Sequence, residues 1–452
     1  MRQRRRRYHL VLWLQVSIVL LIFTSCGEVP LPNKGERSVV FATPSAVSSA
    51  VAIPVCHQAL CLMPKTVPGV RQFVDTWKDV HILLPFTYNM QDAASVAKYY
   101  DFIWGASLTT VPSLRAGNPN IFLSYYIPMN RDGGDFGNSA VGKTRGLSYW
   151  QTLHPDWVLY KCDRTTPAYE IHDPNIPLNM TDENFINWQV QTYATPASQQ
   201  GFDAIAADNL NLDNAFGACG YYNHGKWVQR YTGQSDDPQW RKDMLFWVTE
   251  MQKKLHALPH PMALIANLGY YGSNTISNPA GYQLVQQIVQ HVDGVLDESG
   301  FTHYGVGYLT DQAWINTVRL IQYVQAQQRP YYIIDEFPAD PVSRDDAEWA
   351  LSSYLMGKEH LSALFYSGPQ QYGQDLRYPE YDIPIGMPTN EMYMQQNVYW
   401  RNYSGGLVIV NPSSLQTFTI TLGQNNYTDL DKHAVGQTLT MKPHSGVVLL
   451  KK

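Results

Sequence analysis

The sequence lacks the patterns that usually identify a metal or cofactor site. Its five cysteines have no metal-site spacing with a nearby pair of histidines, so a zinc centre is not expected. No Gly-rich turn follows the first apolar run, VHILLPFTYN, which argues against a dinucleotide-binding sheet. No Gly-x-Ser-x-Gly elbow occurs, which argues against an α/β-hydrolase esterase. The sequence therefore implies no metal, nucleotide or flavin, and it leaves calcium on an acidic loop open.

Charged residues are also scarce, at 16% of the chain, and acids outnumber bases. Residues 1–25 hold five arginines and no acid, so the rest of the chain has 28 Lys and Arg against 38 Asp and Glu. This balance argues against a nucleic-acid partner. Aromatic residues reach 13%, which suits a large core and a cleft lined with rings that bind sugars or peptides.

The N-terminal segment has the organisation of a secretion signal. A basic stretch, MRQRRRRYH, precedes an apolar run and small residues before Cys26. The apolar run is shorter than the ~20 residues that a membrane-spanning helix needs. Residues 23–26, FTSC, resemble a bacterial lipobox, which implies cleavage before Cys26 and a lipid on its sulfur. We expect a signal peptide over 1–25 and a lipid-anchored or secreted extracytoplasmic protein, with an uncleaved anchor as the alternative.

Residues 26–66 are rich in Pro, Ser, Ala and Val without a sustained period, which is typical of a flexible linker. We expect this linker to hold the folded part off the membrane. Disulfides can form in such a compartment. The preferred pairing is Cys56 with Cys61 and Cys162 with Cys219, which is one of three possible pairings of these four cysteines.

Eight apolar runs of strand length, separated by stretches that could hold helices, follow the linker. Continuous apolar runs are expected of strands that are buried on both faces. Three of the intervening stretches, 238–258, 282–291 and 311–327, read as crossover helices. The runs are 80–85, 100–105, 121–127, 202–208, 262–268, 292–297, 331–335 and 361–366.

This alternation predicts a (β/α)₈ TIM barrel over residues 67–388, of α/β class, with an open doubly wound sheet as the alternative. After about Pro388 the sequence changes to alternating and β-branched segments with Gly, Asn and Pro at the breaks. These segments predict a small antiparallel β-sandwich domain over residues 389–452. We expect a monomer.

Polar residues at the ends of the runs are the candidates for an active site, because TIM barrels place their sites at the C-terminal ends of the strands. Asp208 ends the fourth run and the pair Asp297 and Glu298 ends the sixth; strand alternation puts only one of that pair into the barrel mouth. Carboxylates surrounded by amides and rings are what glycoside chemistry requires. The candidate substrate-binding residues are Trp104, Tyr126, Asn130, Asp173, Asn209, Asn267, His303, Asp335 and Tyr366.

Several of these residues also have an ordinary structural interpretation. A carboxylate just past a strand, such as Asp335, can cap a helix or hold a loop. Trp104 and Tyr126 can be packing groups, since aromatic residues fill barrels.

Two segments resemble a known group of enzymes. GFDAIAADN, residues 201–209, is similar to the fourth-strand motif of TIM-barrel glycoside hydrolases of unassigned substrate, with Ala204 where that motif has glycine. HVDGVLDESGF, residues 291–301, is similar to their sixth-strand motif, which ends in an acid. HPDWVLYKCD and IHDPNIPLNM, residues 154–163 and 171–180, resemble segments that lie between the third and fourth strands of these enzymes. The resemblance covers roughly residues 75–384 and extends to a C-terminal β domain.

The resemblance implies Asp208 as the nucleophile and Glu298 as the general acid/base of a retaining glycosidase. It also implies an α-linked oligo- or polysaccharide outside the cell as the carbohydrate substrate. The competing hypothesis is a carbohydrate-binding surface lipoprotein without catalysis, in which Asp208 only accepts hydrogen bonds.

Overall fold

The structure is a computed structural model, and it describes residues 67–71, 82–87, 90–132, 145–169, 175–268, 279–359, 362–423 and 426–452. The predicted signal peptide and linker, with Cys26 and the Cys56–Cys61 pair, lie outside these ranges, and so does Asp173. No helix within the described ranges combines the length and the apolar character needed to cross a membrane.

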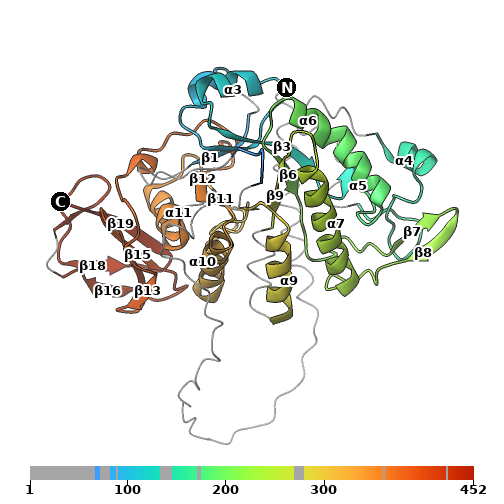
Figure 1. Cartoon of the computed structure of the whole chain (residues 1–452). Coiled ribbons are helices and arrows are strands. Elements are labelled where there is room, and N and C mark those ends of the chain that lie inside the picture. Colours follow the sequence, from blue (N-terminus) through green and yellow to red (C-terminus); the bar gives the residue numbers. More distant parts are fainter. Residues whose placement is uncertain are drawn as a thin grey trace, which may run out of the picture. The chain divides into compact units, whose positions relative to one another are not determined.

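Eight parallel strands form a nearly closed barrel, which confirms the predicted fold class (Figure 1). The strands are hydrogen-bonded in the order in which they occur along the chain, and a parallel bridge between Ile82 and Leu364 joins the last strand to the first. Each strand overlaps one of the predicted apolar runs. The strands are β1 (Leu83–Phe86), β2 (Phe102–Gly105), β3 (Phe122–Pro128), β6 (Ala204–Asp208), β9 (Ala263–Asn267), β10 (Gly294–Asp297), β11 (Tyr331–Glu336) and β12 (Ser362–Ser367).

The strands have no polar face because one side packs inside the barrel and the other packs against helices. Every residue of β1, β3 and β12 is buried, and none of them is charged. Burial on both faces explains why continuous apolar runs, and not alternating ones, predict these strands.

Helices follow most of the strands. The three predicted crossover helices are confirmed as α7 (Pro238–His256), α9 (Pro279–Gln290) and α10 (Asp311–Ala326). Helix α7 begins where it does because Asp237 accepts hydrogen bonds from the amides of Gln239 and Trp240, and Pro238 occupies the first turn. The others are α2 (Ala93–Val96), α3 (Val111–Gly117), α4 (Leu147–Leu153), α5 (Glu183–Gln189) with a π-helical turn (Val190–Ala194), α6 (Thr195–Gln199) and α11 (Arg344–Gly357).

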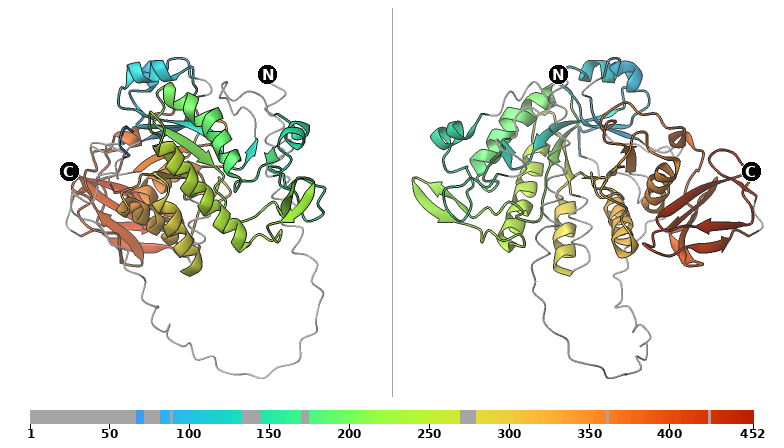
Figure 2. Two further views of the ribbon diagram at one scale, coloured as in Figure 1. Left: turned by 45° about the vertical axis from the view of Figure 1, so that its right-hand side comes forward. Right: turned by 180° about the vertical axis from the view of Figure 1, so that it is seen from behind.

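A subdomain beside the barrel is built from the insertions around β6. The short strands β4 (Arg131–Asp132) and β5 (Ile176–Pro177) pair with each other, and β7 (Gly220–Asn223) pairs with β8 (Lys226–Gln229). Helix α4 and the β7–β8 hairpin lie side by side around a small aromatic core (Figure 2). The predicted Cys162–Cys219 disulfide is confirmed and ties two of these segments together.

The C-terminal part is antiparallel, as predicted. A five-stranded sheet has the order β13 (Tyr393–Gln395), β14 (Val398–Asn402), β15 (Gly406–Asn411), β19 (Ser445–Lys451) and β17 (Tyr427–Thr428). A second sheet pairs β16 (Phe418–Thr421) with β18 (Thr438–Met441). Apolar residues of both sheets share one core, so the two sheets pack face to face.

Helix α11 contacts both the barrel and this C-terminal domain. The buried guanidinium of Arg401 donates to the carbonyls of Leu355, Met356 and Lys358 at 2.9, 3.1 and 2.6 Å. The hydroxyl of Tyr403 donates to the carbonyl of Leu355 at 2.6 Å. The C-terminal domain therefore supplies the hydrogen-bond donors and the positive charge that the end of α11 needs.

Candidate active site

Strand alternation decides which side chains reach the barrel mouth. The ring of Tyr332 in β11 stacks on Phe102 of β2 at a centroid distance of 4.0 Å, and these strands are not neighbours in the sheet. Tyr332 therefore points into the barrel. Because side chains alternate along a strand, Glu336 points the same way and Asp335 points to the opposite side.

Asp208, at the end of β6, is surrounded by hydrogen-bond donors. The Tyr126 hydroxyl donates to its Oδ2 at 2.5 Å, and the amide of Asn267 donates to its Oδ1 at 2.9 Å. Asn209 donates from its backbone N at 2.9 Å and from Nδ2 at 2.8 Å. The guanidinium of Arg131 lies 4.0 Å from Oδ2. These donors and the positive charge stabilise an anionic carboxylate that is still 14% exposed.

Glu298 follows β10 and has the opposite electrostatic environment. Burial, above all, and then the negative charge of Asp208 raise the pKa of Glu298 to about 8. Hydrogen bonds from the Tyr372 hydroxyl, at 2.6 Å, and from Asn267, at 3.0 Å, act in the other direction. Glu298 therefore holds a proton at neutral pH, as a general acid must.

One amide group joins the two acids. Nδ2 of Asn267 donates to Oδ1 of Asp208 at 2.9 Å and to Oε2 of Glu298 at 3.0 Å. These two oxygens can therefore be separated by no more than the sum of the two distances, about 5.9 Å. Retaining glycosidases hold their carboxyl groups ~5–5.5 Å apart, and inverting ones roughly 6.5–9.5 Å apart. The arrangement fits the retaining class.

The other predicted residues divide into those near the acids and those that pack elsewhere. Trp104 is only 2% exposed and lies edge-on to Tyr126 at a centroid distance of 6.4 Å. It therefore packs against the tyrosine that donates a hydrogen bond to Asp208. Asn130 is buried, and its carbonyl accepts a hydrogen bond from the amide of Leu178. His303 lies in the loop after β10, where burial lowers its pKa.

Asp335 and Tyr366 differ from the prediction that they contact substrate. Both are fully buried. Oδ1 of Asp335 accepts a hydrogen bond from the amide of Phe301, at 2.5 Å, and thus holds the loop after β10. Tyr366 stacks on Tyr378 at a centroid distance of 4.4 Å. Each residue ends an apolar run but points away from the barrel interior.

Three residues that the sequence did not single out belong to the site. Arg131 and Tyr372 contact the two acids as described above. Glu336 points into the mouth, and its charge acts on both Glu298 and Tyr372. Strand alternation could have identified Glu336, whereas Tyr372 lies in an irregular segment after β12, whose position only the tertiary structure reveals.

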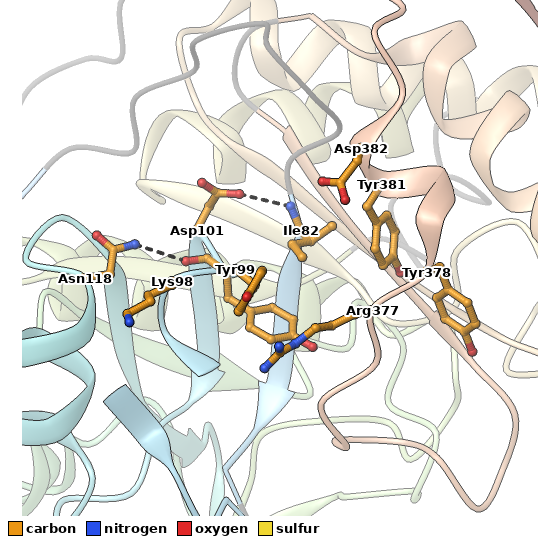
Figure 3. A pocket seen from close by; sticks show the side chains of 10 residues that line it. Ile82, Lys98, Tyr99, Asp101, Asn118, Arg377, Tyr378, Tyr381 and Asp382 are labelled. Carbon is orange, nitrogen blue, oxygen red and sulfur yellow. Dashed lines mark hydrogen bonds between the residues drawn. The ribbon is translucent and has the colours of Figure 1, made fainter. Parts of the chain in front are cut away.

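A cavity of about 160 Å³ is lined by residues that do not include the acid pair; Figure 3 shows its lining. Ile82, Asp101 and Asn118 in its lining precede β1, β2 and β3, so the cavity is at the N-terminal ends of the strands. The rest of its lining consists of Lys98, Tyr99, Tyr100, Arg377, Tyr378, Tyr381 and Asp382.

Among the described residues, one group has ligand atoms close enough to hold a metal ion, namely Asp429, Asp431 and His433. Asp431 also forms an ion pair with Arg344 at 3.3 Å. The group lies in the C-terminal domain, so it takes no part in the chemistry of Asp208 and Glu298.

The chain belongs to the family described as Hypothetical glycosyl hydrolase family 15, which matches residues 118–407. The match includes both acids, and membership makes the protein a glycosidase. No curated protein matches the sequence.

Solved structures with a similar fold include three carbohydrate-active enzymes. A noncanonic maltogenic alpha-amylase, AmyB from Thermotoga neapolitana, is 12% identical over 83% of this chain and 98% of its own, with a TM-score of 0.40. An alpha-amylase from Malbranchea cinnamomea is 9% identical over 81% and 88%, with a TM-score of 0.42. A cycloalternan-degrading enzyme from Trueperella pyogenes is 10% identical over 87% and 64%, with a TM-score of 0.40.

Proposed function

We propose that the protein is a retaining glycosidase that hydrolyses an α-linked oligo- or polysaccharide outside the cell. The observation that carries this proposal is the shared amide of Asn267, which holds Asp208 and the acid of raised pKa, Glu298, within reach of one glycosidic bond. The α linkage rests on the resemblance of the segments that end in Asp208 and Glu298 to the motifs of α-acting barrels.

The first step forms a bond between an oxygen of Asp208 and the anomeric carbon. The bond from that carbon to the glycosidic oxygen breaks, and Glu298 gives its proton to the leaving alcohol. The donors around Asp208 direct their hydrogen bonds at its two oxygens, which favours attack by a carboxylate, whereas Glu298 is the acid with the raised pKa that supplies the proton.

The second step returns the enzyme to its starting state. Glu298, now a carboxylate, takes a proton from water, and the hydroxide formed attacks the anomeric carbon. The bond to Asp208 breaks, and its electron pair returns to the carboxylate. Two inversions at one carbon give net retention.

Trapping of the covalent intermediate tests this assignment directly. A panel of neutral α-glycosyl fluorides with fluorine at C2 or C5 should inactivate the enzyme and add the mass of one glycosyl group to the peptide that contains Asp208. NMR of the first product of an unmodified substrate should show the α anomer. An inverted product, or a label on another acid, would contradict the proposal.

The location is a separate part of the proposal. The basic and apolar N-terminal segment and the FTSC sequence support export, cleavage before Cys26 and lipid attachment. We propose a barrel over 67–388 and a β domain over 389–452, tethered to the membrane as a monomer. Labelling with a radioactive fatty acid in a bacterial host should mark the wild type and not Cys26→Ala. Equal labelling of both would contradict the lipid anchor.

A further inference from the structure

The steps above leave one carboxyl group of the mouth unused. Glu336 is the last residue of β11, and its backbone N–H donates to the hydroxyl of Thr302 at 3.1 Å. This hydrogen bond ties the backbone of Glu336 to the loop that follows Glu298. The side chain points into the barrel mouth, as the stacking of Tyr332 on Phe102 establishes.

The carboxylate of Glu336 has no hydrogen bond or ion pair within the described ranges, although the side chain is largely buried. Asp293, another buried acid, accepts hydrogen bonds from the amide of Leu264 and from side chains that include Gln252 and Arg329. A buried carboxylate without donors is costly, so its retention at the edge of a site indicates a ligand that supplies them.

The charge of Glu336 reaches the acid pair. It acts to raise the pKa of Glu298, together with burial and Asp208, and burial raises the pKa of Glu336 itself to about 7. In the register of β10 and β11, Asp297 pairs with Ile333, so Glu336 extends beyond Glu298 on the neighbouring strand and on the same inward face of the barrel. A group that binds there contacts the sugar ring that is being cleaved or its neighbour.

We propose that Glu336 selects the sugar: its carboxylate accepts hydrogen bonds from hydroxyl groups of a neutral ring held between Asp208 and Glu298, and it repels rings that carry a carboxylate. This inference rests on the proposed function. It adds a substrate class, neutral glycosides with a free hydroxyl group facing β11, and excludes uronic acid residues at that position.

The test compares Glu336→Gln with a matched control, Glu348→Gln. Glu348 of α11 is also a mostly buried acid whose pKa burial raises to about 7, but it lies 4.0 Å from Arg344 and outside the mouth. Calorimetry should measure binding of methyl α-glycosides of neutral hexoses and of the matching uronic acids. kcat and KM should be measured with neutral 4-nitrophenyl α-glycosides.

We expect the wild type and Glu348→Gln to bind the neutral glycosides and exclude the uronides. Glu336→Gln should lose roughly ten- to a hundredfold in kcat/KM for neutral substrates, the effect of losing hydrogen bonds to a charged group. The ratio of its affinity for the neutral glycoside to its affinity for the matching uronide should be smaller than in the wild type. The alkaline limb of its kcat/KM profile should move to lower pH, because the charge that raises the pKa of Glu298 is gone.

Two results would overturn the inference: equal binding of neutral and acidic glycosides by the wild type, or wild-type selectivity in Glu336→Gln. Stronger binding of cationic amino sugars than of neutral ones would overturn it as well. Asp208→Asn separates the two proposals. If Asp208→Asn is inactive and Glu336→Gln keeps wild-type selectivity, only this inference fails. Full activity in Asp208→Asn, or no binding or cleavage of any neutral glycoside by the wild type, contradicts the proposed function too.

Discussion

Two pairs of acids lie at the C-terminal ends of the barrel strands, yet they differ in what surrounds them. Asp208 and Glu298 point into the mouth and share the amide of Asn267. Asp297 and Asp335 point away from the mouth and are at most 1% exposed. Burial raises the pKa of Asp297 to about 6 and that of Asp335 to about 8, so a raised pKa alone does not distinguish the pairs.

The difference lies in the hydrogen-bond partners. Asp297 accepts from the amides of Ser299 and Gly300 and from the Tyr331 hydroxyl, and Asp335 accepts from Phe301, so both bind the chain's own backbone. In the proposed mechanism the pair in the mouth carries out the reaction, whereas Asp297 and Asp335 hold the loop that follows Glu298.

The strongest test of this contrast is Asp208→Asn. It should lower kcat by more than about a thousandfold, because an amide cannot form the glycosyl ester. Circular dichroism should show an unchanged fold, since the amide still accepts hydrogen bonds at Oδ1. A loss of less than tenfold would remove Asp208 from the role of nucleophile.

Glu298→Gln should lower kcat by about 10²–10⁴-fold, the usual contribution of a general acid. Wild-type activity should fall as the pH rises through about 8, because Glu298 then loses the proton that it donates. The variant should lack this alkaline limb. Its kcat should lie closest to the wild-type value with aryl glycosides, whose leaving groups need no proton. The same limb in both proteins would assign the proton donor to another group.

Tyr372→Phe should change activity less than the two substitutions above, and its hydrogen bond to Glu298 determines the direction in which the pH profile moves. The Tyr372 hydroxyl lowers the pKa of Glu298, so its removal should move the alkaline limb to higher pH and reduce kcat by roughly tenfold or less. Tyr378→Phe is the control, because Tyr378 packs on Tyr366 and not on Glu298. A shift toward lower pH, or the same shift in the control, would contradict this reading.

Asp335→Asn should affect stability and hardly change kcat. Since the pKa of Asp335 is raised to about 8 in the native state, the folded protein keeps a proton that the unfolded chain releases above ~4. Wild-type stability should therefore fall as the pH rises from ~4 to about 8, and the variant should lack this component. Urea unfolding at pH 5 and pH 8 measures it. Parallel stability losses in both proteins would show that Asp335 is not buried as a neutral acid.

The same contrast between inward and outward side chains limits how much of the fold and of the site can be predicted from the sequence. Strands buried on both faces leave continuous apolar runs, so the sequence predicts all eight, and their ends indicate Asp208 and the pair Asp297 and Glu298. The choice of Glu298 within that pair comes from the resemblance to glycoside hydrolase motifs. The apolar run of β11 ends at Asp335, which is the predicted site residue, but the alternation of side chains places the next residue, Glu336, in the mouth. Tyr372 gave no signal, because only the path of the chain after β12 brings it to Glu298.

The contact of Arg401 with the end of α11 bears on how this enzyme can be divided. A chain cut before residue 389 would leave the carbonyls of Leu355 and Lys358 without their donors and would expose the outer surface of a barrel helix. The C-terminal sheets therefore cover one helix of the barrel, and we expect a stable catalytic fragment to require them.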